Sequence, residues 1–154
     1  MRIAAVVVLI FMLGSARAQD QLSDIQAHQQ RIDRVASAIL ASQARMLQAP
    51  STMPGRDRAY ESLNWASHLL DGADRDLTAL QLLLNMQQLV SGDSKVQLAS
   101  RIVEIQRGRI RAFVAKGASN CEEMIKMNKD QETVRLLFEA RDAIAATSDL
   151  LQRP

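Results

Sequence analysis

Apolar side chains recur along this chain every three to four residues, and the strict alternation of a β-strand is almost absent. The first segment with this spacing, 21–47, carries an apolar residue at every seventh position: Ile25, Ile32, Ile39 and Met46. The second begins near Asp57 and carries two such columns: Leu63, Leu70, Leu77 and Leu84, and Ala59, Ala66, Ala73 and Leu80. Each segment is therefore predicted to be an amphipathic helix.

Turn-forming residues separate these segments. The run 49–55 contains two prolines and a glycine, and it is predicted to end the first helix because these residues do not continue a helix well. Ser91-Gly92-Asp93 is predicted to end the second. Gly72 lies inside the second helix, but both apolar columns keep their phase across it. This helix is therefore expected to be continuous.

Capping patterns place the third and fourth helices. Residues 94–97 match a capping box and predict a helix start. Lys116-Gly117 is typical of a helix C-terminus, where glycine readily adopts the left-handed conformation. Ser119 with Glu122 matches a second capping box, so the fourth helix is predicted to run from there to about Leu151. Four helices with short connections favour antiparallel neighbours, and we expect an all-α, up-down-up-down four-helix bundle.

The first eighteen residues have the three parts of a secretory signal peptide. Arg2 is a positive n-region, 3–13 is an apolar h-region, and Ser15-Ala16-Arg17-Ala18 predicts cleavage after Ala18. The apolar run is far shorter than the roughly 20 residues of a transmembrane helix. We therefore expect a signal peptide over 1–18 and a single helical-bundle domain over 19–154. The mature chain would be exported to the periplasm or the extracellular space, without a membrane span; an uncleaved N-terminal anchor is the alternative.

Removal of the signal peptide lowers the net charge of the chain, and this bears on which partners are expected. Loss of Arg2 and Arg17 takes the 19 basic residues to 17, equal to the 17 acidic residues. A neutral chain lacks the clustered positive face that nucleic-acid binding requires, and its few aromatic residues do not alternate with Lys or Arg. No nucleic-acid partner is expected.

The common catalytic and cofactor motifs are missing from the sequence, including phosphate-binding loops, zinc-binding helices and the nucleophile elbow. The two histidines, His28 and His68, are predicted to lie about 12 Å apart along the bundle axis and on different faces, too far to share a metal ion. No cofactor and no metal site are expected.

Matching residues by their level along the predicted bundle brings four polar side chains together. His28, Asp76, Arg109 and Asp130 each interrupt an apolar face near one level. A lone buried charge costs several kcal/mol, so these groups should neutralise one another in a polar layer. The layer is either a structural ion network or a functional pocket. In the functional case Arg109 would bind a carboxylate or phosphate, and His28 and one aspartate would be candidates for proton transfer.

Cys121 is the single cysteine, so no intrachain disulfide can form. It is predicted in the first turn of the fourth helix, where backbone amides favour a thiolate but Glu122 and Glu123 oppose it. We expect either an inert residue or an intermolecular disulfide between two copies.

In size and helical class the chain is similar to the exported helical chorismate mutases. That resemblance implies an active site with several inward Arg and Lys side chains, whereas here only Arg109 and Arg141 are predicted to point inward. An enzyme is therefore not the expected class.

Two functions remain as hypotheses. The first is an exported, non-enzymatic interaction or accessory protein that contacts a protein partner or a second copy through a helix face. The second is a bundle that binds a small anionic molecule around Arg109. A cavity at Arg109 would favour the second, and exposure of Leu82, Met86 and Leu89 would favour the first.

Overall fold

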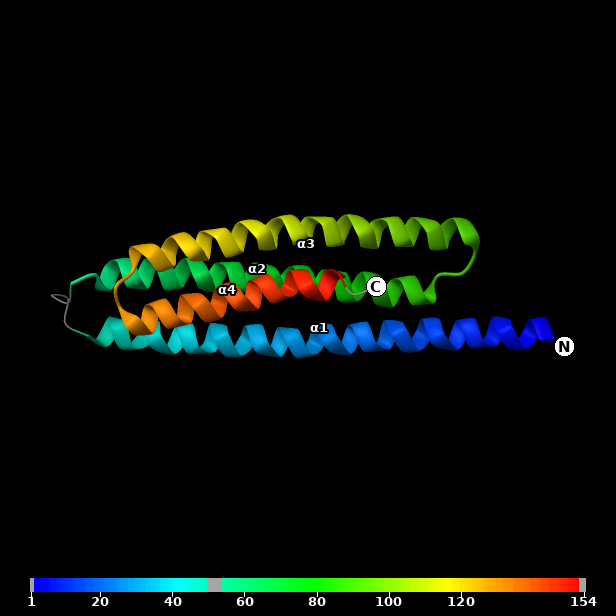
Figure 1. Cartoon of the computed structure of the whole chain (residues 1–154), viewed down its shortest axis with the longest axis horizontal. Helices are drawn as coiled ribbons and strands as arrows, with labels where there is room; N and C mark the ends of the chain where they lie inside the picture. Colours follow the sequence, from blue (N-terminus) through cyan, green and yellow to red (C-terminus); the bar gives the residue numbers. More distant parts are fainter. Residues whose placement is uncertain (1, 50–53, 153–154) are drawn as a thin grey trace.

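Four long helices form the whole architecture of the described chain (Figure 1). A computed structural model describes the backbone over residues 2–49 and 54–152 and the side chains from residue 19 onward within these ranges. The helices are α1 (Arg2–Gln48), α2 (Arg56–Leu89), α3 (Asp93–Met127) and α4 (Gln131–Gln152). Together they make the four-helix bundle that the apolar periodicity predicts.

The helices surround one apolar core. α1 and α3 each contact α2 and α4, and α2 also contacts α4, so α2 and α4 lie on the short diagonal of the bundle. Both heptad columns of α2 are buried, as are Ile25, Ile32 and Ile39 of α1. The four apolar faces therefore meet as the sequence pattern requires.

Positive backbone φ angles mark two of the three connections. Gly55, with φ 79°, precedes α2, and Gly92, with φ 96°, precedes α3. Glycine adopts this left-handed region without the steric cost of a Cβ atom. Helix α2 continues without a break across Gly72, which confirms the continuity inferred from its heptad columns.

The predicted break between the third and fourth helices is wrong. α3 continues through Gly117 to Met127, and Ser119 and Glu122 lie inside it. Gly117 is buried, and a Cβ atom there would lie 3.4 Å from Ile144 and 3.6 Å from Leu69. The glycine thus serves the close packing of α3 on its neighbours rather than a helix end.

The actual start of α4 is capped by Asp130. One carboxylate oxygen of Asp130 accepts hydrogen bonds from the backbone N–H and the hydroxyl of Thr133, both at 2.7 Å. This is an N-cap, which satisfies an amide that the helix itself leaves without a partner. The connection 128–130 is short, and Asn128 secures it by donating to Ser62 Oγ and to the carbonyl of Met124.

α1 extends towards the N-terminus well beyond the predicted start at residue 21. The predicted signal-peptide cleavage after Ala18 falls within this helix, and the side chains of 1–18 lie outside the described residues. Over the described part of the chain, none of the helices combines the length and the apolar character needed to cross a membrane.

Candidate functional site

His28 is buried as predicted, but its partner lies on α4 and was not anticipated. Its Nε2 atom lies 2.9 Å from the hydroxyl oxygen of Thr147, which also donates to the carbonyl of Ala143. Burial, and secondarily the charge of Arg31, lowers the pKa of His28 below 6.5, while a backbone hydrogen bond at Ala143 acts in the opposite direction. The neutral imidazole is therefore the favoured form in the folded protein.

The other three residues of the predicted polar layer do not join His28. Asp76 is half-buried, and its backbone carbonyl accepts a 3.5 Å hydrogen bond from Gln106 Nε2. Arg109 is exposed. Asp130 caps α4, and Thr147, the partner of His28, lies about 25 Å further along that helix at a rise of about 1.5 Å per residue.

The misplaced connection explains why Asp130 does not lie near His28. The third connection lies at 128–130 rather than near 118. In two antiparallel helices, the residue numbers found at one level add up to about twice the number at the middle of their connection. If the connection moves by a few residues along the chain, the residue opposite a given position therefore changes by about twice that number. Asp130 therefore moves from the level of His28 to the end of the bundle.

Cys121 lies in α3 and is fully buried in the core, not in an exposed first turn. Burial raises the pKa of its thiol to about 11, with the nearby charge of Arg141 acting in the opposite direction. A thiol in this position cannot reach a second molecule unless the helices separate, so the geometry argues against the predicted intermolecular disulfide.

The pH dependence of stability should report the burial of His28. The pKa of His28 is lower in the folded state than its ordinary value of 6.5. Between these two pH values, His28 binds a proton more strongly in the unfolded chain than in the folded one. The contribution of His28 to the free energy of unfolding should therefore be constant above pH 6.5 and decrease as the pH falls below it. Chemical denaturation of the wild type and of His28→Gln at several pH values measures this. An identical pH dependence in both proteins would contradict it.

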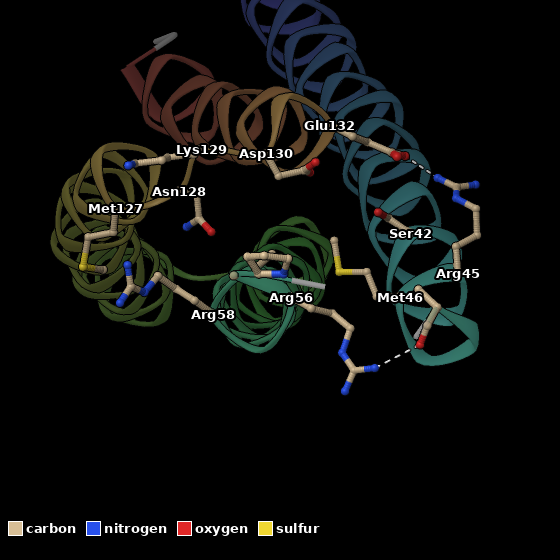
Figure 2. A pocket seen from close by; sticks show the side chains of 14 residues that line it. Ser42, Arg45, Met46, Arg56, Arg58, Met127, Asn128, Lys129, Asp130 and Glu132 are labelled. Carbon is tan, nitrogen blue, oxygen red and sulfur yellow. Dashed lines mark hydrogen bonds and ion pairs between the residues drawn. The ribbon is translucent and has the colours of Figure 1, made fainter. Parts of the chain in front are cut away.

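A cavity of about 470 Å³ lies at the end of the bundle that holds the first and third connections (Figure 2). We call it the end cavity. It is formed where the C-terminal ends of α1 and α3 meet the N-terminal ends of α2 and α4. Its volume is within the range of small-molecule sites. Of the residues predicted for the polar layer, only Asp130 lines it.

The lining of the end cavity has a net positive charge. It contains four cationic residues, Arg45, Arg56, Arg58 and Lys129, and two carboxylates, Asp130 and Glu132. Both carboxylates are already engaged, because Glu132 pairs with Arg45 and Asp130 caps α4. The cavity therefore has more positive charge than its own acidic residues neutralise.

Two of these cations have no partner in the described part of the chain. Arg56 donates to the carbonyl of Ala49 at 3.0 Å and lies 3.3 Å from the Asp57 carboxylate. Arg58 and Lys129, by contrast, form no hydrogen bond or ion pair with any described residue. Both extend along the α3 side of the cavity, near Met127 (Figure 2).

Ser42 contributes a buried hydroxyl to the opposite wall. Its side chain is only 1% exposed, and it makes no hydrogen bond with another described residue. The hydroxyl oxygen points from α1 into the space between the helix ends (Figure 2). A buried polar group usually has a hydrogen-bond partner, so this hydroxyl is available to a ligand.

The N-terminus of α2 also opens onto this space. Gly55, which lines the cavity, occupies the N-cap position and provides no side-chain cap. The first amides of α2 consequently lack a side-chain acceptor. Their partial positive charge adds to that of the side chains.

Sequence reasoning missed the end cavity because it placed the third connection too early. The Asp130-x-x-Thr133 spacing was the available indication, since Asp is a favoured N-cap. Recognising it would have brought Lys129 to the same end of the bundle as Arg56 and Arg58. Elsewhere in the described chain, no group of three His, Cys, Asp or Glu side chains could hold a metal ion.

Two exposed apolar stripes lie at the other end of the bundle, beside the connection between α2 and α3. We call them the hairpin stripes; each follows i, i+4, i+7 spacing. Their members are Leu82, Met86 and Leu89 on α2, and Leu98, Ile102 and Ile105 on α3. The α2 side chains are between 60% and 85% exposed, the surface that was expected to favour a partner.

Fold and site together define a four-helix bundle with a cationic cavity at one end and an apolar hairpin at the other. No protein-family model, curated protein or solved structure matches the chain.

Proposed function

We propose that this chain is an exported helical bundle that binds a small anionic molecule in the end cavity. The single observation that carries the proposal is the Ser42 hydroxyl, which belongs to a residue only 1% exposed, makes no hydrogen bond with another described residue and is directed into a space lined by excess positive charge. A carboxylate or phosphate would form charge-assisted contacts with Arg58 or Lys129 on the α3 side, and the Ser42 hydroxyl would donate a hydrogen bond to the part of the ligand that reaches the opposite wall. Export rests on the signal-peptide pattern of residues 1–18.

The site differs in place, but not in ligand class, from the anionic site expected around Arg109. Arg109 is exposed and does not line the end cavity. Arg58 and Lys129 are also exposed, but they line a cavity that includes the Ser42 hydroxyl, which Arg109 does not. A binding function is favoured over catalysis because the Ser42 hydroxyl forms no hydrogen bond with either carboxylate of the cavity, Asp130 or Glu132, so no base activates it among the described residues.

Titration with inorganic phosphate, followed by two-dimensional NMR, tests the proposal. We expect the largest shifts at the backbone amides of Ser42, Gly55, Arg58 and Lys129. In the double variant Arg58→Gln/Lys129→Gln, the affinity should fall by about tenfold or more, since a hydrogen bond to a charged group contributes roughly 1.5–3 kcal/mol. Arg101→Gln, an exposed cation of α3 outside the cavity, is the matched control and should bind as the wild type does. Shifts spread over the surface, or an unaffected double variant, would refute the site.

We also propose that the hairpin stripes pack against a second copy of the mature chain. The i, i+4, i+7 spacing is the spacing with which helices pack, and the formally neutral mature chain has no net charge to oppose self-association. Sedimentation of the mature chain should give a dimer, and Leu98→Glu/Ile105→Glu should give a monomer. Leu47→Glu, an equally exposed leucine of α1, is the control. A monomeric wild type, or a stripe that binds only another protein, would overturn this proposal.

A further inference from the structure

The end cavity is much larger than a simple inorganic anion. Its volume of about 470 Å³ corresponds to roughly fifteen water molecules at about 30 Å³ each. Inorganic phosphate is only a few water molecules in size and would leave most of this space unfilled. A ligand that fills the cavity therefore carries an organic body in addition to its anionic group.

The remaining lining indicates the character of that body. Ala49, Pro54 and Ala59 present apolar surface, and two methionines flank the space: Met46 on α1 and Met127 on α3. Met46 is partly buried against the core, whereas Met127 is 54% exposed. Methionine is flexible and polarizable and packs against apolar groups of varied shape. These walls suit an apolar chain or ring better than a polyhydroxylated one.

The two carboxylates limit the charge of the ligand. Asp130 and Glu132 line the same cavity, where Asp130 caps α4 and Glu132 pairs with Arg45. A second anionic group placed far from Arg58 and Lys129 would approach one of these carboxylates. The lining thus favours a ligand with one anionic head and an uncharged body.

We infer that the end cavity takes an amphiphilic anion, a molecule with a single carboxylate or phosphate monoester head and an apolar body. This inference rests on the proposed binding function and specifies its ligand class. The head lies against Arg58 and Lys129 on the α3 side of the cavity. The body lies against Met46, Met127 and the neighbouring alanine and proline side chains. The molecule is bound free from solution rather than as part of a membrane.

Calorimetric titration with straight-chain carboxylates from butanoate to decanoate tests the inference. Burial of a methylene contributes about 0.8 kcal/mol, so the affinity should rise by up to about fourfold for each methylene that enters the cavity. Met46→Gln and Met127→Gln should reduce this dependence on chain length. Leu40→Gln, at an exposed apolar side chain of α1 that lines neither the cavity nor the hairpin stripes, should leave it unchanged.

Two further comparisons separate the contribution of the anionic head to the affinity from that of the apolar body. Arg58→Gln/Lys129→Gln should weaken all carboxylates by a similar factor and leave the dependence on chain length intact. Decanol should bind much more weakly than decanoate, whereas decyl phosphate should bind comparably.

The possible outcomes distinguish this inference from the proposed function. If inorganic phosphate binds at the cavity but chain length has no effect, the inference is overturned and the proposed function stands. If neither phosphate nor any carboxylate binds there, both fail. Binding to phosphatidylglycerol vesicles without binding to free decanoate would show a lipid-surface site and would also overturn the inference.

Discussion

Proline at Asn120 should lower the free energy of unfolding by about 3 kcal/mol or more, whereas proline at Gln131 should change it little. Asn120 lies inside α3, where proline removes a backbone hydrogen bond and clashes with the preceding turn. Gln131 is the first residue of α4 after the Asp130 cap. Proline is well tolerated at this position because the backbone N–H there has no partner within the helix. Urea denaturation of the two variants measures the difference.

This pair of variants separates the observed helix boundaries from those predicted by the capping boxes. If the fourth helix began at Ser119, Asn120 would occupy its first turn, and proline there would be tolerated. Gln131 would then lie in a helix interior, where proline is destabilising. The reverse order of stabilities would therefore contradict the continuity of α3.

Leu70→Ala should lower the free energy of unfolding by about 2–5 kcal/mol, the range for leucines deleted from a packed core. Leu70 is completely buried and belongs to the heptad column of α2 that faces the other helices. Removing its side chain leaves a cavity that the long helices can close only in part. Thermal or urea denaturation of the mature chain measures the loss.

Leu40→Ala is the matched control, since it makes the same chemical change at an exposed position outside the hairpin stripes. Leu40 is 59% exposed, so its truncation should change the free energy of unfolding by less than about 0.5 kcal/mol. Equal losses at Leu70 and Leu40 would show that the helix faces are assigned incorrectly.

The buried faces of α1 and α2 could be predicted from the sequence because heptad spacing depends only on local geometry, whereas Arg109, predicted on an inward face of α3, is exposed. Ile25, Ile32 and Ile39 fall on the buried face of α1, and the leucine column of α2 is buried along its length. The connections at 49–55 and 91–93 were also predicted, since proline or glycine there interrupts the helix. These features require no knowledge of the tertiary structure.

The third connection could not be placed reliably because a glycine within a helical pattern either ends the helix or allows a neighbouring helix to pack closely. Gly117 has the local sequence of a helix end, but its buried position against Ile144 and Leu69 is a tertiary requirement. Capping boxes are likewise short patterns that also occur inside helices. Here tertiary packing overrode the local preference, and the error displaced every residue pairing between α3 and α4.

Sequence reasoning found only one residue of the end cavity, Asp130, because the cavity depends on the position of that same connection. Outside the cavity, His28 lies on the buried face as predicted, but Thr147 could be recognised as its partner only with the correct level of α4. The end cavity brings together residues from all four helices and two connections. When residues are paired by their level along a bundle, an error in the position of one connection therefore changes which residues are predicted to form the site.

A crystal structure of the mature chain with ω-bromodecanoate is the most direct test of the central claim. Bromine scatters anomalously, so the position of the apolar end can be located independently of the rest of the ligand. We predict an anomalous peak inside the end cavity, close to Met46 on the α1 side, with the carboxylate directed towards Arg58 and Lys129 on the α3 side. A peak on the hairpin stripes alone, or no peak in the cavity at saturating ligand, would contradict the account.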